Sequence, residues 1–181
     1  PRSKLEVVVV DGASTDGTQE VCLEYEKHYP DFFKVISEGS AHGKPAALNL
    51  ALKHTTGDVI AVFDADSLPE SNIFNLTNEY FADKEIMAVQ GRTTSINERS
   101  SVLTRVIATE EKAWFQMLLS GRERLKLFVP LNGTCQFVRR SVFERIGVWD
   151  ENSLTEDVEY ALRLVEKGGW VKYAPDVCSG Q

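Results

Sequence analysis

Acidic side chains follow two apolar, strand-like segments in the first third of the chain. The valine run Val7–Val10 ends at Asp11, and the apolar run Val59–Phe63 ends at Asp64, with Asp66 two residues further on. Ligands of open α/β sheets bind beyond the carboxyl ends of strands, and alternation along an extended chain points Asp64 and Asp66 to one side. Two such carboxylates repel each other unless a divalent cation takes their oxygens as ligands. The pattern favours a metal-dependent site, with a solvated acidic loop, and ordinary turn chemistry at Asp11, as the structural alternatives.

A glycine and a lysine open the second predicted helix. The segment Gly39–Lys44 does not fit a P-loop, because it is one residue short between its glycines and Pro45 replaces the required Ser or Thr. What remains is Lys44 at a helix N-terminus, a favourable place for an anion, with Asn49 one turn further along. We therefore expect Lys44 to contact a diphosphate and Asn49 to make a polar contact nearby. A solvated surface charge is the alternative for Lys44.

The second half of the chain offers two further groups. Gly133 interrupts an extended segment at Asn132-Gly133-Thr134, which suggests a backbone that something approaches closely. Ser153 and Glu156 have the spacing of a capping box, and the helix dipole stabilises negative charge there. Asp157 is not used by the capping box and is available as a base. Taken alone, a helix-capping role explains this second group best.

These residues need a scaffold of strands and helices in alternation. Strands are predicted at 7–10, 35–36, 59–63, 87–91, 129–138 and 171–173. Helices are predicted at 18–29, 43–57, 70–81, 102–118, 141–146 and 153–168. In the last helix the residues expected to face inward are Val158, Ala161, Leu162 and Val165. The apolar residues of the 102–118 helix fit one amphipathic face: Val102, Leu103, Val106, Ile107, Trp114, Met117 and Leu118. This alternation predicts an α/β domain, mainly a parallel sheet flanked by helices, and 181 residues suit a single domain.

The composition and net charge of the chain indicate which classes of partner and site to expect. Lys and Arg total 20 against 27 Asp and Glu, and a net charge of -7 without a basic stretch disfavours nucleic acid. Three cysteines without zinc spacing indicate neither a disulfide framework nor a Cys-based metal site, and they fit a reducing compartment. Apolar runs fall short of the ~18 residues of a membrane span. The chain opens at Pro1 and ends soon after a strand, so we expect an excised, soluble piece of a longer protein.

Taken in order, these segments resemble the inverting glycosyltransferases of family 2, which have the GT-A fold and include cellulose and hyaluronan synthases. The matching segments are VVVVDGASTDGT (7–18), GKPAALNLAL (43–52), GDVIAVFDADSLPE (57–70), NGTCQFVRRSVFERIGVWDE (132–151) and LTEDVEYALRL (154–164). They span nearly the whole chain in the family's order and spacing. Many relatives carry Asp-Asp-Gly-Ser where this chain has Asp-Gly-Ala-Ser at 11–14, so only Asp11 is available there.

The resemblance implies a role for each matching residue. Asp11, Lys44 and Asn49 would bind the nucleotide of a nucleotide-diphosphate sugar, with UDP expected. Asp64 and Asp66 match the DxD motif, with Asp66 the more direct ligand of Mg²⁺ or Mn²⁺. The acceptor end would be formed by Asn132, Gly133, Thr134 and Glu156, and Asp157 would be the general base.

The resemblance also implies a division of the chain and a cellular place. The nucleotide-binding half would be about 1–91 and the acceptor-binding half about 92–181. The acceptor would be a glycan or a lipid-linked molecule. The full-length parent would work at the cytoplasmic face of a membrane, which it would reach through parts outside this chain.

Two other readings of the same residues stay open. A Mg²⁺-dependent phosphatase or phosphotransferase of the haloacid-dehalogenase kind also places Asp-x-Asp after a strand. In that class a Gly-Thr or similar pair follows, whereas Ser67-Leu68 follows here, and the class gives Thr155–Asp157 no role. A catalytically inactive module that binds a nucleotide-sugar is the other alternative.

Overall fold

A computed structural model describes residues 4–181, which form two compact units. Unit 1 comprises residues 4–58 together with Gly147–Glu156, and unit 2 is Val59–Ile146 together with Asp157–Gln181. The expected nucleotide-binding and acceptor-binding halves remain a prediction.

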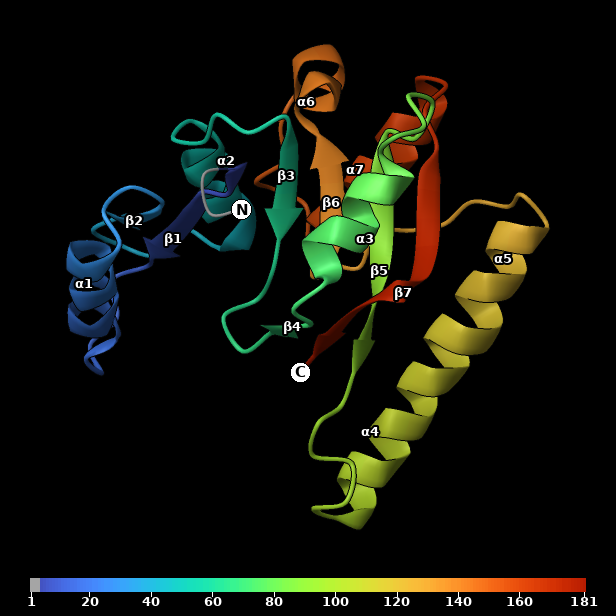
Figure 1. Ribbon diagram of the computed structural model, residues 1–181, viewed down its shortest axis with the longest axis horizontal. Helices are drawn as coiled ribbons and strands as arrows, with labels where there is room; N and C mark the ends of the chain where they lie inside the picture. The colour runs from blue at the N-terminus through green and yellow to red at the C-terminus, as the bar shows by residue number, and fades with distance from the viewer. Residues whose placement is uncertain (1–3) are drawn as a thin grey trace. The chain divides into compact units, whose positions relative to one another are not determined.

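Unit 1 is built on two parallel strands. β1 (Val7–Asp11) pairs with β2 (Phe33–Ser37), and the helices α1 (Thr18–His28) and α2 (Lys44–Leu52) complete the unit (Figure 1). The helix predicted at 43–57 ends at Leu52 because the chain beyond it bonds elsewhere. The Glu6 carboxylate accepts hydrogen bonds from the backbone N–H groups of Thr56 and Gly57.

Unit 2 contains a five-stranded sheet in the order β3-β6-β5-β7-β4. Its strands are β3 (Val59–Val62), β4 (Leu68–Pro69), β5 (Ala88–Thr94), β6 (Gln136–Arg139) and β7 (Val171–Gly180). Only β5 and β7 run parallel, whereas β3 with β6, β6 with β5, and β7 with β4 are antiparallel. The α/β class is as predicted, but the mainly parallel sheet is corrected to a mixed one, because β6 enters between β3 and β5.

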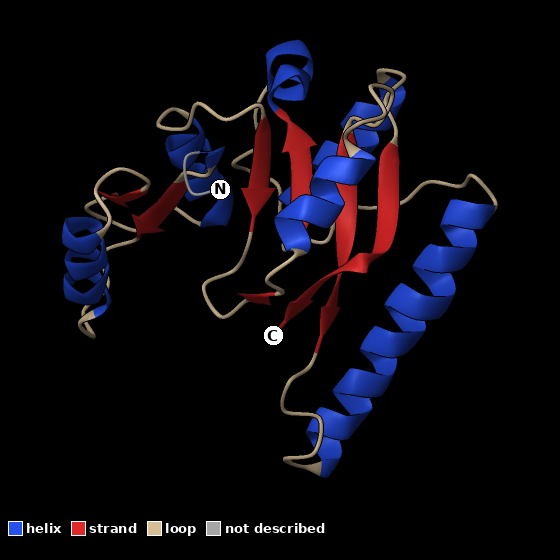
Figure 2. Cartoon of the chain, in the orientation of Figure 1, coloured by secondary structure: helices blue, strands red, loops and turns tan. Residues whose placement is uncertain are grey.

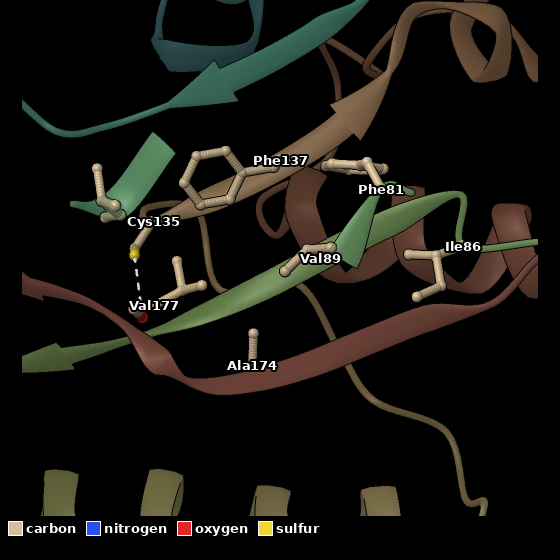
Figure 3. Packing of buried hydrophobic residues seen from close by; sticks show 8 residues of the cluster. Phe81, Ile86, Val89, Cys135, Phe137, Ala174 and Val177 are labelled. Atoms are coloured by element: carbon tan, nitrogen blue, oxygen red, sulfur yellow. Dashed lines mark hydrogen bonds between the residues drawn. The ribbon is translucent and has the colours of Figure 1, made fainter. Parts of the chain in front are cut away.

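One face of this sheet carries the apolar core of unit 2. Val89 of β5, Phe137 of β6 and Val177 of β7 pack together, and the Cys135 thiol points at the Val177 carbonyl oxygen (Figure 3). The helix α3 (Ile73–Tyr80) adds Ile73, which is 1% exposed. Aromatic and branched side chains on alternate positions of neighbouring strands give this face its stability.

A second helix packs on unit 2 through its own apolar stripe. In α7 (Glu156–Glu166) the side chains of Tyr160, Ala161 and Leu164 are buried, whereas Leu162, expected to face inward, is 49% exposed. The Tyr160 ring lies 5.1 Å from the ring of Phe143 in α6 (Arg140–Ile146). Figure 1 shows α3 in front of the sheet and α7 behind it.

A long helical segment runs from residue 102 to residue 124. It comprises α4 (Val102–Lys112), a π-helical stretch η2 (Ala113–Leu119) and α5 (Ser120–Arg124). Figure 2 shows these parts as one continuous helix. Buried side chains on it are Ala108, Phe115 and Leu119. The apolar face predicted from the sequence is exposed instead: Val102, Leu103, Val106, Ile107, Trp114, Met117 and Leu118. Across residues 4–181 no helix has the length and apolarity needed to cross a membrane.

Candidate active site

The chain leaves β3 in a tight turn that carries Asp64 and Asp66. The Asp64 backbone N–H donates to the Thr134 hydroxyl at 3.1 Å, and the Ser67 N–H donates to the Asp64 carbonyl at 3.0 Å. The hydroxyls of Ser67 and Thr134 lie 3.1 Å apart and share a further hydrogen bond. Thr134, 5% exposed, therefore fixes both ends of the Asp64–Ser67 turn.

The Asp66 carboxylate projects from this turn into solvent. Its Oδ1 accepts a hydrogen bond of 3.4 Å from the side-chain amide of Gln181. The Gln181 backbone is itself held, since its N–H donates to the Thr94 carbonyl and its carbonyl accepts from the Ile96 N–H. Asp64 is half-buried, so one site contains an exposed and a partly shielded carboxylate.

The donor set of this turn suits a hard divalent cation. Carboxylate oxygens are the ligands that Mg²⁺ and Mn²⁺ take in proteins, and Mg²⁺ commonly uses one or two carboxylates together with substrate phosphates. Within residues 4–181 no three His, Cys, Asp or Glu side chains are grouped closely enough to hold a metal. Asp66, with Asp64 beside it, would hold such a cation, and phosphate oxygens would complete its shell.

The turn before β6 has an unusual backbone. Gly133 has φ 72°, and Cys135, which is not a glycine, has φ 49°. Left-handed conformations cost free energy for residues with a Cβ and persist where neighbours hold them. Gly133 and Thr134 are buried and Asn132 is half-buried. The Asn132–Thr134 turn is thus a fixed feature beside the Asp64–Ser67 turn.

The proposed general base lies at the start of α7. Asp157 is half-buried, and its Oδ1 accepts from the Val158 N–H at 2.8 Å. In the predicted capping box, the Ser153 hydroxyl would accept from the N–H of Glu156. It accepts from the Thr155 N–H instead, which forms a shorter turn. Glu156 is 8% exposed.

Unit 1 carries the remaining predicted residues. Asp11 ends β1 and is 3% exposed, with both carboxylate oxygens 3.3 Å from the Ser14 nitrogen. Lys44 is exposed and begins α2, as predicted. Asp16 lies just before α1, where hydrogen bonds from the backbone and hydroxyl of Thr18 lower the pKa of its carboxyl.

Asn49 is bonded differently from the expectation. Its side-chain N–H₂ donates to the Trp149 carbonyl and to the Glu151 carboxylate, each at 2.9 Å, and its Oδ1 accepts from the Trp149 N–H at 3.1 Å. The amide is 6% exposed and links α2 to the segment 147–151 within unit 1. The structure gives Asn49 a structural role, and its contact with a nucleotide stays a prediction.

Unit 2 therefore brings Asp64 and Asp66 together with Thr134 and the turn that contains it. Sequence reasoning missed Ser67 and Gln181, because their partners are 67 and 115 residues away and leave no local signal. Asp11, Lys44, Asn49 and Glu156 belong to unit 1. The convergence of the carboxylates of Asp11, Asp64, Asp66 and Asp157 on one cation stays a prediction.

Comparison with known proteins identifies the family. Residues 1–179 match the family described as glycosyltransferase like family 2. The probable glycosyltransferase YdaM of Bacillus subtilis is 33% identical over 97% of this chain and 42% of its own length. The beta-monoglucosyldiacylglycerol synthase of Nostoc sp. is 34% identical over 91% of this chain and 35% of its own. The chain thus spans less than half the length of these relatives.

Solved structures agree with the fold. The mannosyltransferase PcManGT from Pyrobaculum calidifontis, in complex with GDP-Man and Mn²⁺, superposes with a TM-score of 0.76 at 27% identity, over 100% of this chain and 48% of that one. Staphylococcus aureus TarS 1–349 with UDP-GlcNAc, at 18% identity, has a TM-score of 0.73 over 100% of this chain and 50% of that one, and supports the fold alone. The chain belongs to the family 2 glycosyltransferases and has their α/β GT-A fold.

Proposed function

We propose that the protein is a metal-dependent inverting glycosyltransferase that moves a sugar from a nucleotide-diphosphate donor to a glycan or lipid-linked acceptor. One observation carries the proposal: the Thr134 hydroxyl joins the DxD turn at Asp64 to the turn that contains Asn132. The motif for the donor and the segment for the acceptor are thereby held in one hydrogen-bonded unit. A phosphatase of the dehalogenase kind does not account for family 2 membership.

The donor would bind with its diphosphate at the Asp64–Ser67 turn. A cation held by Asp66 would neutralise the charge that develops on the leaving nucleoside diphosphate. The backbone N–H of Asp64 is held by Thr134, and its carboxylate would contact the ribose or the diphosphate. Lys44, exposed at the N-terminus of α2, would add a positive charge and a helix dipole for the same diphosphate. Asp11 would contact the base or the ribose.

The acceptor would be activated by Asp157. A carboxylate within hydrogen-bond reach of the acceptor hydroxyl can take its proton as the oxygen attacks the anomeric carbon. One displacement, with no covalent intermediate, inverts that carbon. Asn132, Gly133, Thr134 and Glu156 are the predicted contacts for the acceptor.

The names of the relatives support a chemical class for the donor and for the acceptor. We expect a UDP-sugar, and GDP-mannose is the competing donor because the mannosyltransferase neighbour binds GDP-Man. A lipid acceptor is supported by relatives named beta-monoglucosyldiacylglycerol synthase. An acceptor of this kind would place the full-length protein at a membrane surface, at its cytoplasmic face. An inactive nucleotide-sugar binding module is the remaining alternative.

Two variants of the full-length protein test the assignment. Asp66→Ala should abolish the Mn²⁺-dependent binding of UDP in a calorimetric titration, while replacement of an exposed aspartate just before β3, Asp58→Ala, should leave it unchanged. Asp157→Asn should keep that binding but lose transfer with UDP-glucose, UDP-N-acetylglucosamine or GDP-mannose. Unchanged UDP binding by Asp66→Ala, or retained turnover by Asp157→Asn, would reject the corresponding role.

A further inference from the structure

The Asn132–Thr134 turn is held by hydrogen bonds to the side chain of Gln90, which lies outside the site described so far. Gln90 of β5 is 0% exposed. Its Oε1 accepts from the Asn132 N–H at 2.9 Å, and its Nε2 donates to the carbonyl oxygens of Thr134 at 3.1 Å and Cys135 at 3.4 Å. The Gln90 amide therefore forms hydrogen bonds to the turn on both sides of Gly133.

These hydrogen bonds support a part of the backbone that has an unfavourable conformation. Gly133 and Cys135 both have positive φ, and an L residue in that region needs support from its surroundings. The buried N–H and C=O groups of such a turn also need partners, because leaving them unpaired is costly. Gln90 supplies an acceptor and a donor at the required places. Its Nε2 also donates to the Gly91 carbonyl at 2.9 Å, which fixes the orientation of the amide.

We propose that Gln90 is a positioning residue for sugar transfer, which keeps the Asn132–Thr134 turn in the conformation that receives the acceptor. The inference rests on the proposed function, in which this turn is the acceptor end. Gln90 acts through Asn132 and Thr134 and does not touch the reacting atoms. Loss of its amide would leave the turn free to relax, whereas the Asp64–Ser67 turn, which has no hydrogen bond to Gln90, would be affected only through Thr134.

The chain offers a matched control in the adjacent strand. Gln136 of β6 lies opposite Gln90 in the sheet register and is likewise 0% exposed. Its Nε2 and Oε1 have no hydrogen-bond partner among residues 4–181. Replacing this side chain by Met removes the same amide from the same face without taking a bond from the turn.

The first measurement does not depend on any activity. In full-length Gln90→Met, hydrogen exchange of the backbone amides at 131–136 should be faster than in the wild type by at least about tenfold, since a local opening now lacks its main restraint. Gln136→Met should exchange at the wild-type rate there. Equal rates in the two variants would overturn the proposal. If Gln90→Met does not fold, Gln90→Glu replaces it, because the carboxylate still accepts from the Asn132 N–H but cannot donate to Thr134 and Cys135 unless protonated.

The second measurement separates positioning from simple stability. With UDP-glucose as donor and dioleoylglycerol in detergent micelles as acceptor, transfer by Gln90→Met should fall up to about 10²-fold relative to hydrolysis of the same donor by water. Loss of folded protein would lower both rates equally and leave their ratio unchanged, which would overturn the proposal.

For Gln90→Glu the ratio of transfer to hydrolysis should recover as the pH is lowered, because a protonated carboxyl donates again. A ratio independent of pH would count against the role. If the wild type turns over none of the donors, the proposed function fails, and the exchange data alone decide whether Gln90 holds the turn.

Discussion

Replacing Thr134 by Val should weaken the DxD turn without touching either of its carboxylates. The two side chains are nearly the same size, so the change removes a hydroxyl and little else. That hydroxyl accepts from the Asp64 N–H and shares a hydrogen bond with Ser67, both at 3.1 Å. An unpaired buried donor costs about 1–3 kcal/mol, and since Asp64 is half-buried we expect about 1–2 kcal/mol. For a chain of this size each kcal/mol lowers Tm by about 2–4 °C.

The same variant should bind the nucleotide less tightly. If the lost free energy must be supplied again to order the turn before binding, then Kd for UDP in Mn²⁺ rises about tenfold for each 1.4 kcal/mol. Thermal unfolding followed by circular dichroism gives the first quantity, and calorimetric titration of the full-length protein gives the second. Thr134→Ser is the matched control, because it keeps the hydroxyl and removes one methyl group.

Ser67→Ala completes a double-mutant cycle with Thr134→Val. The two hydroxyls contact each other, so their effects on the free energy of unfolding should be less than additive. Wild-type affinity for UDP in Thr134→Val, with the expected loss of stability, would refute the reasoning. It would mean that Thr134 supports the fold but does not order the turn for its ligand.

Three further predictions concern the packing around the site. Gly91→Ala should lower the free energy of unfolding by about 1–3 kcal/mol in urea titrations, because a Cβ there would lie 2.5 Å from the Cys135 sulfur and 2.7 Å from the Val177 carbonyl oxygen. Adding Cys135→Ala should restore only part of the loss, and full stability in Gly91→Ala alone would contradict the packing. Asn49→Leu should speed hydrogen exchange at 147–151, since the Trp149 N–H and C=O lose their partner, and unchanged exchange would show that other contacts hold the segment. Burial raises the pKa of the Cys135 thiol from 9.0 to about 12, so the folded state keeps a proton that the unfolded state releases, and stability should decline as the pH rises from about 9 towards 12. Cys135→Ala should show a shallower decline, and identical pH profiles would refute this assignment.

Strands that are apolar throughout were located from the sequence, whereas the end of a strand that contains a proline was placed too early. The runs Val7–Val10 and Val59–Phe63 agree with β1 and β3 to within one residue. β7 was expected to end before Pro175 but continues to Gly180, because the register between β5 and β7 shifts between Gln90 and Arg92. A bulge of this kind accommodates a residue that cannot donate to the ladder, and periodicity within one strand does not reveal it.

The exposed face of the 102–118 helix shows a second limit of periodicity. The pattern placed Val102, Val106 and Met117 on one face, and all three are exposed. A count of apolar positions does not say which face of a helix is covered, and here the smaller stripe containing Phe115 and Leu119 is buried. Exposed apolar patches on soluble proteins are commonly interaction surfaces. The larger apolar face of this helix can therefore stay exposed in the folded chain.

Site residues were predictable where the rule was local. Asp64 and Asp66 could be found because a polar pair at the end of a buried strand is visible within a few residues. Gln90 could not be found, and Thr134 was named for the acceptor end but not for its bond to the DxD turn, since these hydrogen bonds join residues 42–44 and 70 positions apart. Asn49 shows the same effect, because its partners lie 100–102 residues away and were not weighed.

The antiparallel direction of β6, which the sequence pattern did not predict, is the reason why the Asn132–Thr134 turn lies beside the Asp64–Ser67 turn. In an antiparallel pair the start of one strand lies beside the end of the other, and Gln136 at the start of β6 faces Val62 at the end of β3. The turn that precedes β6 must therefore lie next to the turn that follows β3, where Thr134 reaches the Asp64 N–H. A parallel β6 in the same position would carry that turn to the opposite end of the sheet. The antiparallel insertion thus places the predicted acceptor segment beside the DxD motif, and Gln90, opposite Gln136 on the other flank, can hold it there.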